Sequence, residues 1–220
     1  VGHQAYAHKI ITGRKNEFKK IRQYGGISGF LKIDESEYDS FGAGHASTSI
    51  SAGLGYAHSR DKDKKNHQIV SIIGDGAMTG GLAYEGLNNL GFHKTQMTVV
   101  LNDNSYSISE SVGALSKYLT RIVTNPTYNK LRKDLWNLTD KIPTISNPIK
   151  KFIKKTEGSL KAYLTPGILF EELGLRYIGP IDGHDIENMI KVFNSIKEMN
   201  TPVLLHVHTN KSKGVNIGDK

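Results

Sequence analysis

Three short runs of apolar residues stand out along the chain, and each has the length of a buried strand. They cover residues 68–73 (QIVSII), 96–103 (QMTVVLND) and 202–209 (PVLLHVHT). Continuous apolar runs of this length, rich in β-branched side chains, are typical of parallel strands that are covered on both faces. The pattern therefore predicts an α/β fold with a mostly parallel sheet.

Helical periodicity occupies the intervals between these runs. Residues 82–92 (LAYEGLNNLGF) have helical spacing and end near Gly91, a residue type that suits a helix C-terminus. Residues 185–199 place six apolar side chains on one face, with Asp185 as the N-cap. Residues 45–60 are rich in small side chains, which allow a helix to pack closely against its neighbours. This order predicts right-handed strand-helix-strand units with helices on both faces of the sheet.

The remaining segments fit one domain over residues 1–220. Residues 105–167 are mostly polar helix and loop and are too long for a simple connection, so we expect a helical excursion that covers one side of the sheet. Pro180 and Gly183 predict a turn within GPIDGHD. The chain starts at Val1 within a running segment, which suggests a fragment or a processed product.

Composition narrows the class of protein. The 220 residues include no cysteine, so any metal is left to oxygen or imidazole ligands. No apolar stretch approaches the roughly 20 residues that span a bilayer, and we expect no membrane partner. The formal charge is +8, with basic clusters at residues 130–133 and 150–155. The second cluster lies on the polar face of a helical stripe without interleaved aromatic residues, so we expect no nucleic-acid partner.

An aspartate lies where the first apolar run gives way to a helical pattern, in GDGAMTGG. Such a turn normally presents backbone N–H groups and the positive end of a helix dipole to a phosphate. Asp75 would repel that phosphate unless a cation lies between them. Asn104 follows the next run about 30 positions later, the length of one strand-helix-strand unit, so both residues are expected at the same edge of the sheet.

Carboxylate and amide oxygens are hard donors of the kind that Mg²⁺ or Ca²⁺ accepts. The pattern predicts a divalent cation held by Asp75, Asn104 and the backbone carbonyl of Tyr106. The cation would bridge to a diphosphate bound by the N–H groups of Gly76 and Ala77. P-loop, dinucleotide and EF-hand patterns do not match, because the glycines lack a following Lys-Ser/Thr and the acidic residues are wrongly spaced. A tight turn closed by the aspartate side chain is the simpler alternative.

Several stretches together resemble deoxyxylulose-5-phosphate synthases, thiamine-diphosphate enzymes related to transketolase. The matching stretches are VGHQAYAHKIITGR, GAGHASTSISAGLGYA, IIGDGAMTGGLAYEGLNN, LNDNSYSISESVGALS and PGILFEELGLRYIGPIDGHD. The resemblance spans nearly the whole chain and implies the thiamine-diphosphate-binding fold, here as the N-terminal diphosphate-binding domain. The family's pyrimidine-binding and C-terminal domains have no counterpart in the sequence.

The resemblance also implies roles for single residues. Asp75, Asn104 and Tyr106 match the magnesium ligands, and Asn104, Gly76 and Ala77 match contacts to the cofactor. Further cofactor contacts are implied in two other motifs, at Gly44, His45, Ala46 and His3. His3 and His45 are expected to be catalytic, and His3 matches a histidine near the reacting thiazolium that could shuttle protons. Ala46 replaces the serine that is usual in the family, and Val215 replaces an aromatic residue near the C-terminus.

The family reaction condenses pyruvate with glyceraldehyde 3-phosphate, with loss of CO₂, in the biosynthesis of isoprenoid precursors, thiamine and pyridoxal. The implied cofactors are thiamine diphosphate and Mg²⁺. The implied setting is a homodimer in the bacterial cytoplasm or the plastid interior. The glutamate that activates the cofactor in this superfamily comes from a domain missing here, so we expect the isolated chain to bind little cofactor and to be inactive. A catalytically silent binding or assembly module that keeps the fold is the alternative.

The remaining histidines allow more than one interpretation. His206 and His208 lie on the same face of one predicted strand and could pair on a metal, or could simply be packed or exposed. His184 could lie at the edge of the site.

Overall fold

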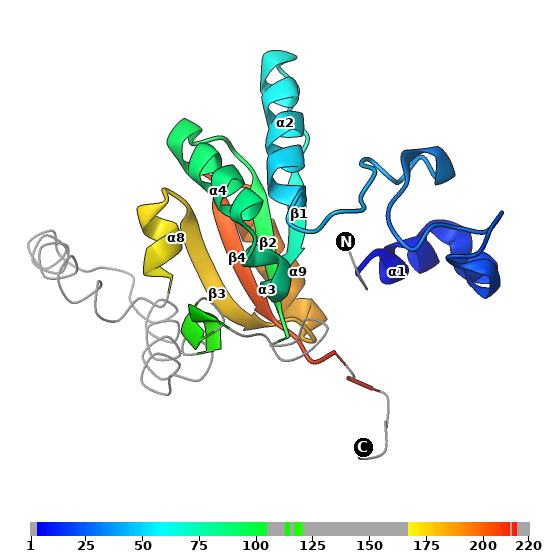
Figure 1. Cartoon of the computed structure of the whole chain (residues 1–220). Helices are drawn as coiled ribbons and strands as arrows, with labels where there is room; N and C mark the ends of the chain where they lie inside the picture. The colour runs from blue at the N-terminus through cyan, green and yellow to red at the C-terminus, as the bar shows by residue number, and fades with distance from the viewer. Residues whose placement is uncertain (1–3, 105–112, 115–116, 121–166, 212, 215–220) are drawn as a thin grey trace, which may run out of the picture.

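The structure, a computed structural model, describes residues 4–104, 113–114, 117–120, 167–211 and 213–214. Its centre is a parallel sheet in the order β1-β2-β4-β3 (Figure 1). The strands are β1 (Val70–Gly74), β2 (Thr98–Asp103), β3 (Arg176–Asp182) and β4 (Val203–His208). The predicted α/β class and the three predicted strands are confirmed.

Helices cover both faces of this sheet, as predicted. Helices α2 (Ser49–Lys62), α4 (Gly81–His93) and α8 (Ile168–Glu172) lie on one face, and α9 (Ile186–Ile196) lies on the other (Figure 1). The larger core cluster joins α2, α4 and α8 to the first face. The smaller cluster joins α9 to the second face. Strands β2 and β4 therefore have a hydrophobic environment on both sides, which explains their continuous apolar runs, whereas the edge strand β1 leaves Val70 and Ile72 exposed on its second face.

Glycines allow α2 to pack closely, which confirms the expectation for residues 45–60. A Cβ atom on Gly53 of α2 would lie 2.3 Å from Ser71 Oγ and 2.5 Å from Met97 Cε. A Cβ atom on Gly86 of α4 would lie 2.9 Å from Ile50 Cγ2. The Ser71 hydroxyl also donates to the carbonyl of Ser49 at 2.7 Å and so fixes the start of α2 on β1.

The turn predicted at Pro180 is wrong, because strand β3 runs through this residue to Asp182. A proline is tolerated here because β3 is the edge strand of the described sheet and its register shifts between Ile178 and Ile181. The turn begins only at Gly183. The next helix, α9, starts as predicted, because the Asp185 side chain accepts the backbone N–H of Asn188 at 3.0 Å.

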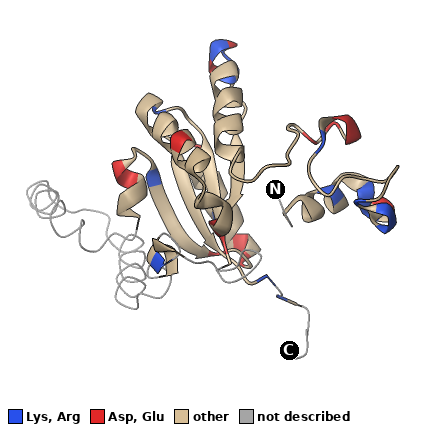
Figure 2. Ribbon diagram, viewed as in Figure 1, with Lys and Arg blue, Asp and Glu red and all other residues tan. Residues whose placement is uncertain are grey.

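The N-terminal part of the chain is helical but irregular. It contains α1 (Gln4–Lys9), the π-helical η1 (Ile10–Arg14) and the 3-10 helices η2 (Lys15–Lys20) and η3 (Ile33–Glu35). Figure 2 shows that basic residues gather on these helices and near the end of α2. Both basic clusters predicted from the sequence, at residues 130–133 and 150–155, lie outside the described residues.

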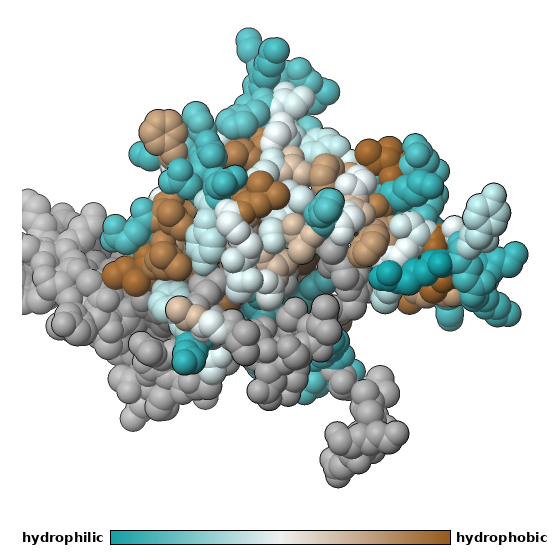
Figure 3. Space-filling model, viewed as in Figure 1, coloured by the Kyte–Doolittle hydropathy of each residue, from teal (hydrophilic) through white to brown (hydrophobic). Residues whose placement is uncertain are grey.

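Most of the expected excursion at residues 105–167 also lies outside the described residues. Of the part that is described, Leu119 is buried in the larger core cluster and Tyr118 packs against it. The face shown in Figure 3 carries several separate apolar patches between hydrophilic residues. Among the described helices, none is long and apolar enough to cross a membrane.

Candidate functional site

The carboxyl ends of the four parallel strands meet at one edge of the sheet, and two predicted metal ligands lie there. Asp75 is the first residue of the short helix α3 (Asp75–Met78), directly after β1. Asn104 directly follows β2, and β1 and β2 pair with Gly74 opposite Asn102. The exposed fractions of Asp75 and Asn104 are 6% and 7%. Two buried oxygen-bearing side chains therefore follow the ends of neighbouring strands, as the spacing predicts.

The predicted cofactor loop at Gly44, His45 and Ala46 is linked to the turn that contains Asp75. All three residues are exposed and precede α2. Ser47 is held at φ 70° and its hydroxyl donates to the carbonyl of Ala77 at 2.7 Å. Segments that are thirty residues apart in sequence thus form one surface at the edge of the sheet. Gly76 and Ala77 are half-buried on that surface.

The N-terminal helix reaches the same edge. A Cβ atom on Gly74 would lie 3.6 Å from the side-chain nitrogen of Gln4, so α1 begins close to the end of β1. His3, Tyr106 and Val215 lie outside the described residues. Their predicted roles stay predictions.

A buried ionic cluster, defined here as Lys9, Arg14, Glu35 and Asp39, holds the N-terminal helices together. The Arg14 guanidinium donates two hydrogen bonds to Asp39, at 2.8 and 2.7 Å, and lies 3.4 Å from Glu35. Lys9 pairs with Glu35. His8 Nε2 also contacts the Asp39 carboxylate, at 2.9 Å.

These contacts change the acidity of both carboxyl groups. The hydrogen bonds from Arg14 hold the pKa of Asp39 well below its ordinary value, against the opposing effect of burial. Burial would raise the pKa of Glu35, but hydrogen bonds from Lys9 and the backbone of Ser28 lower it overall. Both groups are therefore stabilised in their charged form.

A second buried network links three strands beside Asn104. His206 of β4 is fully buried, with Nε2 2.9 Å from the Asp103 carboxylate and Nδ1 2.7 Å from the Tyr177 hydroxyl. Sequence reasoning left His206 between metal binding and packing, and it did not single out Asp103 or Tyr177. The one signal in the sequence was the alternation of side chains along β2 and β3, which places Asp103 and Tyr177 on a buried face.

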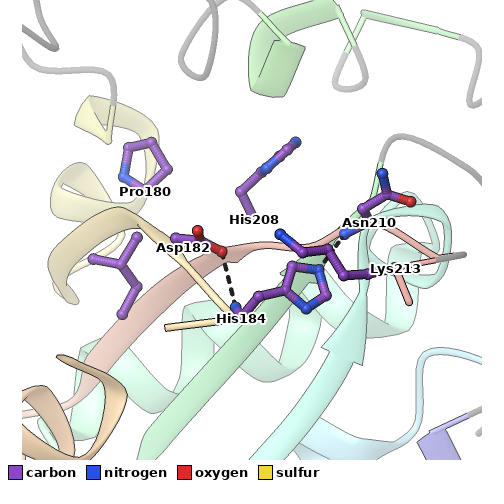
Figure 4. A pocket seen from close by; sticks show the side chains of 7 residues that line it. Pro180, Asp182, His184, His208, Asn210 and Lys213 are labelled. Atoms are coloured by element: carbon purple, nitrogen blue, oxygen red, sulfur yellow. Dashed lines mark hydrogen bonds between the residues drawn. The ribbon is translucent and has the colours of Figure 1, made fainter. Parts of the chain in front are cut away.

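A pocket opens at the carboxyl ends of β3 and β4, on the same edge of the sheet. It encloses about 350 Å³ and is lined by Pro180, Ile181, Asp182, His184, His208, Asn210 and Lys213. Figure 4 shows that the side chains of His184, His208 and Lys213 surround the hollow. His184 Nε2 accepts the backbone N–H of Asn210 at 2.8 Å, so the two loops that form the pocket are bonded to each other. Histidine, cysteine, aspartate and glutamate side chains form no metal-binding group of three or more among the described residues.

A model of the 1-deoxy-D-xylulose-5-phosphate synthase family matches residues 1–209. The chain belongs to this family. It is 51% identical over 220 residues to the 1-deoxy-D-xylulose-5-phosphate synthase of Natranaerobius thermophilus, covering 100% of this chain and 35% of that protein. It is 54% identical over 214 residues to that of Carboxydothermus hydrogenoformans, covering 97% of this chain and 34% of that protein.

The chain thus spans about a third of the length of these curated relatives of the synthase family. A transketolase from Campylobacter jejuni has a similar structure, with a TM-score of 0.61 over 91% of this chain and 26% of that one, at 19% identity. At this identity the likeness shows the fold, and it confirms the transketolase-like fold expected from the motifs.

Proposed function

We propose that this chain is the diphosphate- and magnesium-binding part of a 1-deoxy-D-xylulose-5-phosphate synthase. The observation that carries the proposal is the pair of buried oxygen-bearing side chains, Asp75 and Asn104, after neighbouring parallel strands. Ligands of open parallel sheets bind at this edge. The family membership and the high identity to named synthases support the same assignment.

The residues at this edge fit thiamine diphosphate and Mg²⁺. Magnesium takes few protein ligands and completes its shell with water and phosphate oxygens, so a carboxylate and an amide oxygen suffice as side-chain ligands. Asp75, Asn104 and the carbonyl of Tyr106 would hold the metal. The N–H groups of Gly76 and Ala77 would bind the diphosphate. When bound, the cofactor supplies the electron sink of the reaction, and the protein positions it.

The loop that precedes α2 would complete the cofactor contacts. Gly44, His45 and Ala46 are exposed beside the diphosphate turn and are joined to it through Ser47, so they can contact a ligand bound there. We assign catalytic roles in proton movement to His45 and His3. Imidazole suits this role because its ordinary pKa lies near neutral pH.

For the complete protein we propose the reaction expected from the sequence motifs, with pyruvate and glyceraldehyde 3-phosphate as substrates and loss of CO₂. A homodimer in the bacterial cytoplasm fits the bacterial origin of the relatives. The chain by itself is proposed to bind the cofactor weakly and not to turn over, because it spans only part of the length of these relatives.

The test is calorimetric titration of thiamine diphosphate into the chain, with and without Mg²⁺. We expect heat that depends on Mg²⁺ in the wild type and is abolished in Asp75→Ala, because the variant lacks the carboxylate of the proposed ligand set. Asp182→Asn is the matched control, since Asp182 also ends a strand but is exposed and two strands away from β2. Binding that is absent in the wild type, even with the remaining family sequence present, would favour a silent module.

A further inference from the structure

The strongest unassigned feature is the buried network of Tyr177, His206 and Asp103, because it ends one residue before a proposed metal ligand. We propose that Asp103 is a positioning residue for Asn104, held in place by His206 and Tyr177. This inference rests on the proposed function. It gives a role to three buried polar side chains that are not among the proposed cofactor contacts.

The network crosses the sheet from its edge strand to its centre. Tyr177 lies on β3, His206 on β4 and Asp103 at the end of β2, with exposed fractions of 9%, 0% and 2%. The two hydrogen bonds of His206 run through its two ring nitrogens, at 2.7 Å to Tyr177 and 2.9 Å to Asp103. Because buried polar groups are costly without partners, this arrangement has a narrow range of allowed geometries.

A neutral imidazole can make both hydrogen bonds of His206. With the proton on Nε2, a neutral His206 donates to the Asp103 carboxylate and accepts the Tyr177 hydroxyl at Nδ1. The imidazole then needs no net charge in the core. The ring orientation is fixed from both sides, and so is the Asp103 carboxylate that it meets.

Asp103 is also fixed through its backbone and its neighbour. The Thr209 N–H donates to the Asp103 carbonyl at 2.8 Å, and the Thr209 hydroxyl donates to the Asn102 side chain at 2.7 Å. The end of β2 is therefore bonded at three points immediately before Asn104, once to His206 of β4 and twice to Thr209, which directly follows β4. Since Asn104 lies beyond the last residue of the strand, these bonds determine the direction in which its backbone leaves the sheet.

Phe170 allows the network to be tested without disturbing the core. Its ring stacks on Tyr177 at 6.0 Å and an interplanar angle of 5°. Tyr177→Phe keeps this stack and removes only the hydroxyl that orients His206. Tyr84→Phe is the matched control, because Tyr84 is a half-buried tyrosine that takes no part in the network.

The experiment measures the Mg²⁺ concentration that half-saturates binding of thiamine diphosphate to the chain, together with the thermal midpoint of each variant. We expect Asp103→Ala to raise the half-saturating concentration about tenfold, as the loss of residues that orient metal ligands does. Tyr177→Phe should raise it about threefold, as expected for one lost hydrogen bond. Asp103→Asn keeps an oxygen that accepts from His206 and should stay within about twofold of the wild type. Tyr84→Phe should match the wild type.

A purely structural network would give a different result. Thermal midpoints would fall in Asp103→Ala and Tyr177→Phe while the Mg²⁺ requirement of the folded protein stayed unchanged, and that result would overturn the inference. If Asp103→Ala does not fold, Tyr177→Phe decides. Asp75→Ala in the same assay separates the two proposals. If this variant abolishes Mg²⁺-dependent binding and the network variants do not change it, only the positioning role is refuted. A wild type that shows no Mg²⁺-dependent binding, even with the remaining family sequence present, overturns both proposals.

Discussion

Replacing Asp39 by asparagine tests how much the buried ionic cluster contributes to the N-terminal helices. Arg14 is 5% exposed and donates its two shortest hydrogen bonds to Asp39, so Asp39→Asn leaves a buried guanidinium without its main counter-ion. Removing one partner of a buried ion pair costs about 3–5 kcal/mol. Glu35 remains 3.4 Å from Arg14 and offsets part of this cost, so we expect about 3 kcal/mol, the lower end of that range.

Hydrogen exchange of peptides from residues 8–39 is the appropriate assay, because the change is local. A loss of about 3 kcal/mol corresponds to exchange that is faster by a factor of about 10² at neutral pH. Asp34→Asn is the control, since Asp34 is exposed on the 3-10 helix η3 a few residues before Asp39 and its replacement should change stability by less than about 0.5 kcal/mol. Equal protection in Asp39→Asn and the wild type would refute the reasoning.

The pH dependence of the same exchange gives a second check on Asp39. Its pKa is lowered in the folded state, so its contribution is complete above the ordinary carboxyl value of about 4 and is lost as the pH falls below it. The lowered pKa of Glu35 acts in the same direction. We therefore expect the wild type to lose protection in this segment below about pH 4, and Asp39→Asn to lose less. If the protection of Asp39→Asn falls as steeply below about pH 4 as that of the wild type, the titration of Asp39 is not the cause of the pH dependence.

Further predictions concern the helices. Gly91→Ala should destabilise the protein by about 1–3 kcal/mol, because a Cβ atom would lie 1.6 Å from the carbonyl oxygen of Leu173. Gly55→Ala, where nothing lies within 4 Å, should stabilise α2 by about 0.5–1 kcal/mol. The two thermal midpoints should therefore move in opposite directions. Asp185→Ala should cost about 1 kcal/mol by removing the N-cap of α9, whereas Glu198→Ala, at an exposed residue after the helix, should leave urea denaturation unchanged.

The sequence predicted the elements whose physical signal is local. Strands β1, β2 and β4 are continuous apolar runs, and α9 combines a clear apolar face with an aspartate cap. Strand β3 was missed because Pro180 and the following Gly183 gave this segment the composition of a turn, and only its edge position makes the proline tolerable. The positions of Asp75 and Asn104 were predictable because parallel strands end at a common edge.

Contacts that depend on distant partners could not be predicted from local patterns. Arg14 and Asp39 are ordinary polar residues in sequence, and only the fold buries them together. The same holds for His206, whose partners come from two other strands, 29 and 103 positions away. A periodicity argument assigns such residues to a face of an element, and it does not identify the residue opposite.

The bond between Ser47 and Ala77 has an evolutionary consequence. A Cβ atom on Gly80 would lie 2.4 Å from Ser47 Oγ. A larger residue at position 80 therefore requires a smaller residue at position 47 or another rotamer of the serine, which would break its bond to Ala77. Substitutions at these two positions should therefore occur in pairs among family members, and one changed alone should be rare. Covariation between positions 47 and 80 would then reveal this contact from family sequences alone.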